Sequence, residues 1–185
     1  MEVMGKKKVL AISGSTRAQS ANLNYIRAIS DLAAGHFSVS LFEGLMNIPP
    51  FNPDDDTDDP PEVIKDFRNQ LKEADGILIC TPEYAMGVPG TLKNAIDWTV
   101  SSMEFSKKPV ALVTASLSGL KGHAALLETL NVIESKITSA TSLVISFAKT
   151  KVSGDGKITD AATLEEVHKL ISAFSVMMNE NQANI

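Results

Sequence analysis

The chain has 185 residues and a mass of 19.8 kDa, which is the size of a single domain. Hydrophobic residues make up 44% and charged residues 21% of the sequence, a balance that excludes a disordered chain. The net charge of −5 disfavours nucleic acid or anionic lipid as a partner, and the single cysteine excludes an internal disulfide framework.

Short apolar runs alternate with longer segments in which apolar residues recur at the spacing of a helix. The short runs predict five strands, at residues 9–12, 37–41, 77–80, 110–113 and 143–145. The periodic segments predict five helices, at residues 20–35, 60–74, 90–100, 125–137 and 164–178. A long irregular segment, residues 43–59, carries the acidic run 54–59, which we expect to be a solvated loop.

This alternation predicts an α/β fold in which helices cover both faces of a doubly wound, five-stranded parallel sheet of order 2-1-3-4-5. We expect residues 1–185 to form one domain with a frayed tail over 179–185. Sheets of this kind bind ligands at the carboxyl ends of the strands, at the switch point between strands one and three. The functional loops are therefore predicted at residues 13–20, 81–89 and 115–122.

The loop after the first strand has the groups that a phosphate site needs. Ser15 and Ser20 carry hydroxyls, and Arg17 offers a planar fork of donors. The helix that begins near Ser20 directs free backbone N–H groups toward the same space. The spacing is that of neither a G-x-G-x-x-G dinucleotide motif nor a P-loop. The residues alone leave two interpretations open: a monophosphate site, or a Ser20 helix cap beside a solvated Arg17.

Two motifs together resemble the NADPH-dependent FMN reductase family, whose fold is flavodoxin-like. The first motif is Gly14-Ser15-Thr16-Arg17-x-x-Ser20-x-Asn22. The second joins Thr81-Pro82-Glu83-Tyr84 to Val88-Pro89-Gly90-x-Leu92-Lys93-Asn94-Ala95-Ile96-Asp97-Trp98. The resemblance implies bound FMN, with NADPH or NADH as co-substrate.

Carried over to matching positions, the resemblance assigns the FMN phosphate to Ser15, Arg17, Ser20 and Asn22. It assigns the flavin ring and ribityl chain to Pro82, Glu83, Tyr84, Ala85, Met86 and Gly87. In the third loop, Ser116, Ser118 and Gly119 are expected to face the ring. Many members of the family have Asn where this chain has Ala85, so the resemblance does not identify the electron acceptor.

Other polar and aromatic side chains are assigned to structure. Asn94 and Asp97 share a helix face and are expected to anchor a loop or to pack against a second subunit. Trp98 is expected in the core or in an interface, and Cys80 is expected to be an inert buried thiol. His123 is expected to be an exposed residue at the start of a helix.

The resulting hypothesis is an FMN-dependent NAD(P)H oxidoreductase that passes electrons to free flavin, a quinone, an azo compound or a metal oxyanion. The alternative is a flavodoxin-type electron carrier that binds FMN without oxidising a nicotinamide. No side chain is expected to act as a general acid or base, and no metal site is expected.

No apolar stretch approaches the roughly 20 residues of a membrane span, so we expect a cytoplasmic protein. The resemblance also implies a homodimer or homotetramer.

Overall fold

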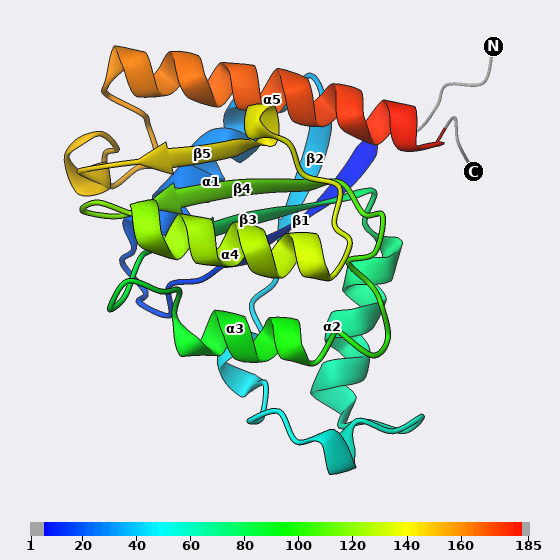
Figure 1. Ribbon diagram of the computed structural model, residues 1–185. Coiled ribbons are helices and arrows are strands. Elements are labelled where there is room, and N and C mark those ends of the chain that lie inside the picture. Colours follow the sequence, from blue (N-terminus) through cyan, green and yellow to red (C-terminus); the bar gives the residue numbers. More distant parts are fainter. Residues whose placement is uncertain (1–5, 183–185) are drawn as a thin grey trace.

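The computed structural model, which describes residues 6–182, is built around a five-stranded parallel sheet (Figure 1). Its strands are β1 (Lys7–Ser13), β2 (Phe37–Leu41), β3 (Gly76–Thr81), β4 (Val110–Ala115) and β5 (Ser142–Ile145). They lie in the order β2-β1-β3-β4-β5, and all neighbouring pairs are parallel. The predicted fold class, strand order and strand positions are confirmed.

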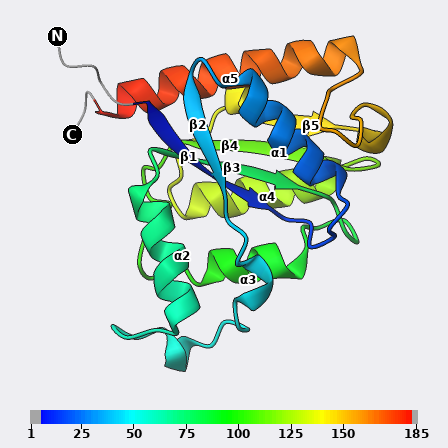
Figure 2. The same cartoon turned by 180° about the vertical axis from the view of Figure 1, so that it is seen from behind.

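Helices cover both faces of the sheet, as Figures 1 and 2 show from opposite sides. They are α1 (Ala21–Leu32), α2 (Glu62–Glu73), α3 (Gly90–Asp97), α4 (Leu120–Val132) and α5 (Ala161–Gln182). Side chains of α1 and α5 pack into one core, and side chains of α2, α3 and α4 pack into the other. The strands β3 and β4 are buried along their whole length between these layers, which explains their unbroken apolar runs.

The fourth helix is displaced from its predicted position. Helical spacing predicts residues 125–137, whereas α4 runs from Leu120 to Val132. Gly119, with a φ of 91°, adopts the left-handed conformation immediately before Leu120, so the helix begins early. Glu134, with a φ of 59°, lies just after the helix, and Ile137 packs against the core from the segment that follows.

The last helix also differs from expectation. Helix α5 continues to Gln182, beyond residue 179 where the frayed tail was predicted to begin. Residues 183–185 of that tail lie outside the described residues. None of the helices formed by residues 6–182 combines the length and apolar character needed to cross a bilayer.

Candidate functional site

A pocket of about 480 Å³ lies among the loops that follow β1, β3, β4 and β5. This is the edge of the sheet at which β2 and β3 flank β1, the switch point predicted to bind a ligand. The volume falls within the roughly 300–1,000 Å³ that is typical of small-molecule sites. Of the thirteen predicted site residues, the structure brings seven together in the pocket lining: Ser15, Arg17, Ser20, Asn22, Pro82, Tyr84 and Ser116.

The first loop supplies the pocket with backbone donors. Ser20 caps α1, and its Oγ accepts a hydrogen bond of 3.2 Å from the N–H of Asn22. The backbone N–H groups of residues 16–21 have no hydrogen-bond partner within residues 6–182. These donors at the start of a helix are therefore left for solvent or for an anionic ligand.

Two cations line the pocket, and no carboxylate of the described residues lines it with them. Arg17 and Lys149 are exposed. Neither side chain forms an ion pair or a hydrogen bond with any of the residues that the structure describes. In a chain with a net charge of −5, this local excess of positive charge favours an anionic ligand.

The second loop forms a tight turn. Tyr84 and Gly87 exchange two backbone hydrogen bonds of 2.9 Å across Ala85 and Met86. Both central residues have a positive φ, 48° for Ala85 and 64° for Met86, as a type I′ turn requires. The side chain of Met86 is exposed at the tip of this turn. The loop thus contributes its base, Pro82 and Tyr84, to the pocket lining.

Six predicted residues are not part of the lining: Glu83, Ala85, Met86, Gly87, Ser118 and Gly119. The carboxylate of Glu83 instead meets the first turn of α4, where its Oε2 accepts the N–H of Gly122 at 2.7 Å. A Cβ at Gly122 would lie 2.7 Å from the carbonyl oxygen of Gly87, so the helix and the turn are in close contact. Glu83 therefore joins the second loop to α4.

A fourth loop, residues 146–150, was missed by the reasoning from sequence. Its pocket-lining residues are Phe147, Ala148, Lys149 and Thr150. Four other unpredicted residues line the same space: Gln19, Ala21, Ala115 and Leu117. Because β5 lies beside β4, its carboxyl end must face the same edge of the sheet. The predicted strand order alone could have identified this loop.

Buried groups near the pocket confirm one assignment and correct another. Cys80 is fully buried, and burial raises the pKa of its thiol, which makes it inert as predicted. The prediction of an exposed His123 is wrong, because only 8% of this residue is accessible. Its Nδ1 lies 2.8 Å from the hydroxyl of Thr114 and its Nε2 lies 2.7 Å from that of Ser142. Burial lowers the pKa of His123, so this ring is a neutral link between β4 and β5.

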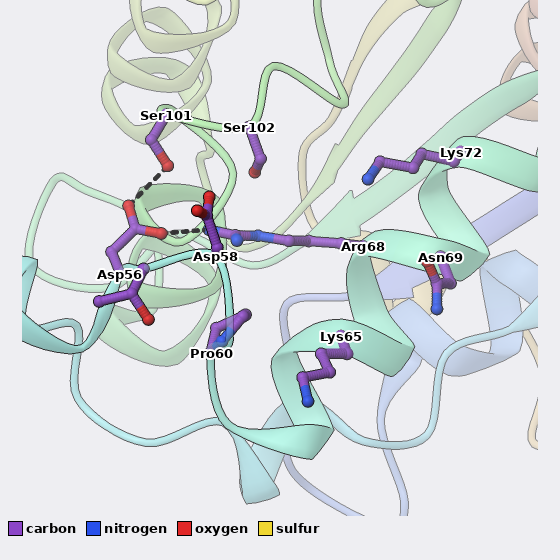
Figure 3. A pocket seen from close by; sticks show the side chains of 10 residues that line it. Asp56, Asp58, Pro60, Lys65, Arg68, Asn69, Lys72, Ser101 and Ser102 are labelled. Atoms are coloured by element: carbon purple, nitrogen blue, oxygen red, sulfur yellow. Dashed lines mark hydrogen bonds and ion pairs between the residues drawn. The ribbon is translucent and has the colours of Figure 1, made fainter.

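A second hollow, of about 660 Å³, lies between α2 and the segment after α3 (Figure 3). Each of its cations is paired with a carboxylate. The ion-pair distances are 2.5 Å for Lys65 and Asp59, 2.6 Å for Arg68 and Asp56, and 3.5 Å for Lys72 and Glu104. Internal pairing of this kind leaves little attraction for a charged ligand.

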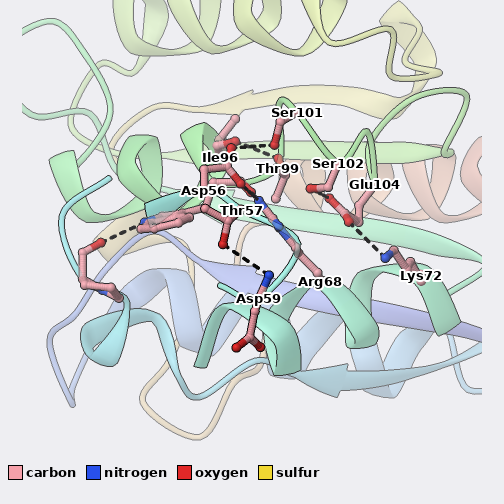
Figure 4. Close-up of polar contacts among 12 residues, drawn as sticks. Asp56, Thr57, Asp59, Arg68, Lys72, Ile96, Thr99, Ser101, Ser102 and Glu104 are labelled. Atoms are coloured by element: carbon pink, nitrogen blue, oxygen red, sulfur yellow. Dashed lines mark hydrogen bonds and ion pairs between the residues drawn. The ribbon is translucent and has the colours of Figure 1, made fainter. Parts of the chain in front are cut away.

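The pair of Arg68 and Asp56 is the centre of a polar network beside this hollow (Figure 4). Asp56 accepts hydrogen bonds of 2.6 Å from both Arg68 and Ser101. Arg68 Nε also donates to the carbonyl of Trp98 at 2.9 Å. The side chain of Asp56 is 9% exposed, so the expectation of a wholly solvated acidic loop is wrong at this residue. The cause is Arg68, which lies buried on α2 and requires a counter-charge.

The long irregular segment before α2 is held from α3. Asn94 Nδ2 donates to the carbonyl of Pro49 at 2.8 Å, and Asn94 Oδ1 accepts from the N–H of Phe51 at 2.7 Å. The indole N–H of Trp98, which is fully buried, also donates to Pro49 at 2.9 Å. Asn94 anchors a loop, as predicted, and Trp98 lies in the core.

Comparison with known proteins agrees with this architecture. A family model described as NADPH-dependent FMN reductase matches residues 7–150. The chain is 38% identical over 122 residues to a quinone reductase of Pseudomonas putida, a match that spans 63% of this chain but only 64% of that protein. It is 33% identical to an NAD(P)H-dependent FMN reductase of Pseudomonas aeruginosa, over 91% of this chain and 94% of the relative. The structure of FerB, a flavoenzyme NAD(P)H:(acceptor) oxidoreductase from Paracoccus denitrificans, superposes with a TM-score of 0.85 at 26% identity, covering 95% and 98% of the two chains.

Proposed function

The chain belongs to the NADPH-dependent FMN reductase family, and from this premise we propose that it is an FMN-dependent oxidoreductase that transfers electrons from NADPH or NADH to a small-molecule acceptor. The proposal rests above all on the pocket at the switch point, where cations and backbone N–H groups that have no partner among residues 6–182 meet. An anionic ligand of small-molecule size would satisfy both. FMN, with one terminal phosphate and a flat ring, has the chemistry that this lining requires.

The residues of the first loop would hold the phosphate. Arg17 can form charge-assisted hydrogen bonds with it, and the hydroxyls of Ser15 and Ser20 lie in the same lining. The N–H groups of residues 16–21 add donors, and the dipole at the start of α1 favours the negative charge. Asn22 is buried beside them, with its Oδ1 3.4 Å from the sulfur of Cys80.

The second and third loops would hold the flat part of the cofactor. Tyr84, Pro82 and Leu117 supply apolar surface to the lining, and Ser116 supplies a polar group. When bound, FMN supplies the redox chemistry, accepting electrons from the nicotinamide and donating them to the acceptor. The role of the protein is to bind and orient the reactants, so no side chain needs to act as a general acid or base.

The visible absorption spectrum of the purified protein tests this proposal. The FMN-loaded protein should show oxidised flavin bands, and anaerobic addition of NADPH or NADH should bleach them. A protein that takes up no FMN would contradict the cofactor assignment. A protein that keeps its flavin bands with both nicotinamides would instead be a flavodoxin-type carrier.

Three finer points remain predictions. The acceptor is a quinone, an azo compound, free flavin or a metal oxyanion, and the names of the relatives favour the first. A homodimer or homotetramer is predicted from the family resemblance, and size-exclusion chromatography with light scattering tests it. The cytoplasmic location is predicted from the sequence, and fractionation of cells tests it.

A further inference from the structure

The loop after β5 holds a bulky residue in a backbone conformation that bulky residues avoid. Phe147 has a φ of 54° and a ψ of 35°, in the left-handed region. That region is favourable for Gly and tolerable for Asn, but a large side chain there is an outlier. Such conformations persist where the surrounding structure enforces them, and they gather at functional sites.

Four hydrogen bonds enforce the conformation of this loop. The N–H groups of Phe147 and Ala148 donate to the carbonyls of Leu117 and Ser116 at 3.1 and 3.0 Å. The hydroxyl of the buried Tyr25 donates to the carbonyl of Ala148 at 3.0 Å, and the hydroxyl of Ser146 donates to the carbonyl of Ser118 at 2.9 Å. The loop is thus tied to both the third loop and α1, beside the tip of β4 (Figure 1).

The result of this strained, tied backbone is an aromatic ring at the pocket that packs against little else. Phe147 lines the pocket, yet 62% of it is accessible. Leu117 and Tyr84 line the same pocket and are 75% and 50% accessible. We name these three residues the apolar rim. An exposed group of large apolar side chains around a pocket marks a surface that binds an apolar partner.

We propose that Phe147 is a specificity-determining residue for the electron acceptor, and that its ring packs against flat, apolar acceptors. This inference rests on the proposed function, because it concerns the second substrate of the same site. A flat aromatic acceptor removes apolar surface of the rim from water when it binds. A hydrated anion gains nothing from the ring, since it would have to give up water for an apolar contact. The ring therefore favours the first class over the second.

The substitution Phe147→Gly separates the ring from the backbone. Glycine adopts a positive φ without strain, so the loop should keep its conformation while the ring is lost. On the oxidised, FMN-loaded protein, the dissociation constant of 1,4-naphthoquinone should rise about tenfold, a change of the size expected for losing part of a buried aromatic contact. In turnover with NADPH, the KM for naphthoquinone should rise similarly, whereas the KM for ferricyanide should change less than about twofold.

Two further substitutions and one control sharpen the test. Phe147→Asn also suits the left-handed region and should behave like the glycine variant, whereas Phe147→Tyr keeps the ring and should bind naphthoquinone as the wild type does. Met103→Gly is the matched control, because Met103 has a φ of 61°, is 59% accessible and lies in the segment between α3 and β4. It should leave both acceptors unaffected.

The outcomes separate this inference from the proposed function. An unchanged dissociation constant of naphthoquinone in Phe147→Gly overturns the role of Phe147, as does an equal weakening of naphthoquinone and ferricyanide. A loss of FMN affinity in the same variant overturns it as well, because the ring would then hold the cofactor. Failure of the wild-type protein to oxidise NADPH or NADH overturns the proposed function alone, since binding of naphthoquinone is measured without turnover.

Discussion

The larger hollow of this molecule, between α2 and the segment after α3, has about 660 Å³ and contains cations that are all held by carboxylates. The smaller pocket, at the carboxyl ends of the strands, has about 480 Å³ and contains Arg17 and Lys149, which no described residue neutralises. Size alone would rank the first above the second as a ligand site. The pairing of charges reverses that order, because polar groups that bind one another have little left to offer a ligand.

The two regions also use their charged residues for different purposes. Around the larger hollow, ion pairs hold an irregular segment against two helices and stabilise the fold. Around the smaller pocket, the fold leaves donors free and thereby prepares a site. Substitutions in the first region should therefore change stability and leave ligand affinity unchanged, and substitutions in the second should do the reverse.

Asp56→Ala should have the largest effect, and that effect should be on stability. The substitution leaves the buried guanidinium of Arg68 without its counter-charge, which should lower the free energy of unfolding by about 3 kcal/mol. Urea unfolding measures the change, and Asp58→Ala, an exposed neighbour in the same hollow, is the control. The affinity for FMN should not change. Equal unfolding midpoints for the two variants would mean that the pair at Asp56 does not stabilise the protein.

Arg17→Ala should have the next largest effect, on affinity. Loss of a charge-assisted contact to phosphate should cost about 1.5–3 kcal/mol of binding free energy for FMN, and much less for riboflavin, which has no phosphate. Titration monitored by flavin fluorescence measures both ligands. Lys65→Ala, which removes a paired cation of the larger hollow, is the control and should bind FMN normally. If riboflavin weakens as much as FMN, Arg17 does not contact the phosphate.

Glu83→Ala should have a smaller effect, and that effect should be on stability. The substitution tests whether a charged residue in a loop beside the smaller pocket has a structural role. The carboxylate of Glu83 is satisfied by the N–H of Gly122 at the start of α4, so it should behave as a structural charge despite its place in the family motif. We expect a loss of about 1 kcal/mol in the free energy of unfolding, typical of a helix cap. FMN affinity should stay within about twofold, and Glu83→Gln should recover part of the stability. A large loss of FMN affinity without a loss of stability would return Glu83 to the binding site.

Much of the fold could be predicted from the sequence because its signals are local. Buried parallel strands are continuous apolar runs, and the helices between them have regular apolar spacing. The order of the elements and the position of the switch point could therefore be predicted from the sequence. The start of α4 could not be predicted, since it depends on Gly119 adopting a positive φ and on the hydrogen bond from the N–H of Gly122 to Glu83. Both depend on contacts between residues that lie far apart in the sequence.

The site was predictable only in part for the same reason. The first loop is contiguous in sequence, and its four predicted residues all line the pocket. Ala85 and Met86 do not line the pocket, because they form the tip of a type I′ turn, and the family motif does not predict that turn. Phe147 and Lys149 come from a loop that carries no recognisable motif and reaches the pocket only through the position of β5.

Replacing His123 should have the smallest effect. The substitution tests whether a buried, hydrogen-bonded side chain stabilises the fold in a pH-dependent way. Burial between Thr114 and Ser142 holds its pKa below the ordinary value of 6.5. The unfolded chain therefore binds a proton first as the pH falls, so this contribution to stability is present above pH 6.5 and is lost as the pH falls through the depressed pKa.

Urea unfolding at about pH 7.5 and pH 5.5 measures stability on either side of the ordinary pKa, below which this loss begins. Wild-type protein should lose more stability between the two conditions than His123→Gln, which cannot titrate there. His168→Gln is the matched control, because His168 is exposed and should keep the wild-type response. If all three proteins respond equally, His123 does not carry the pH dependence, and the link between β4 and β5 does not depend on a neutral ring.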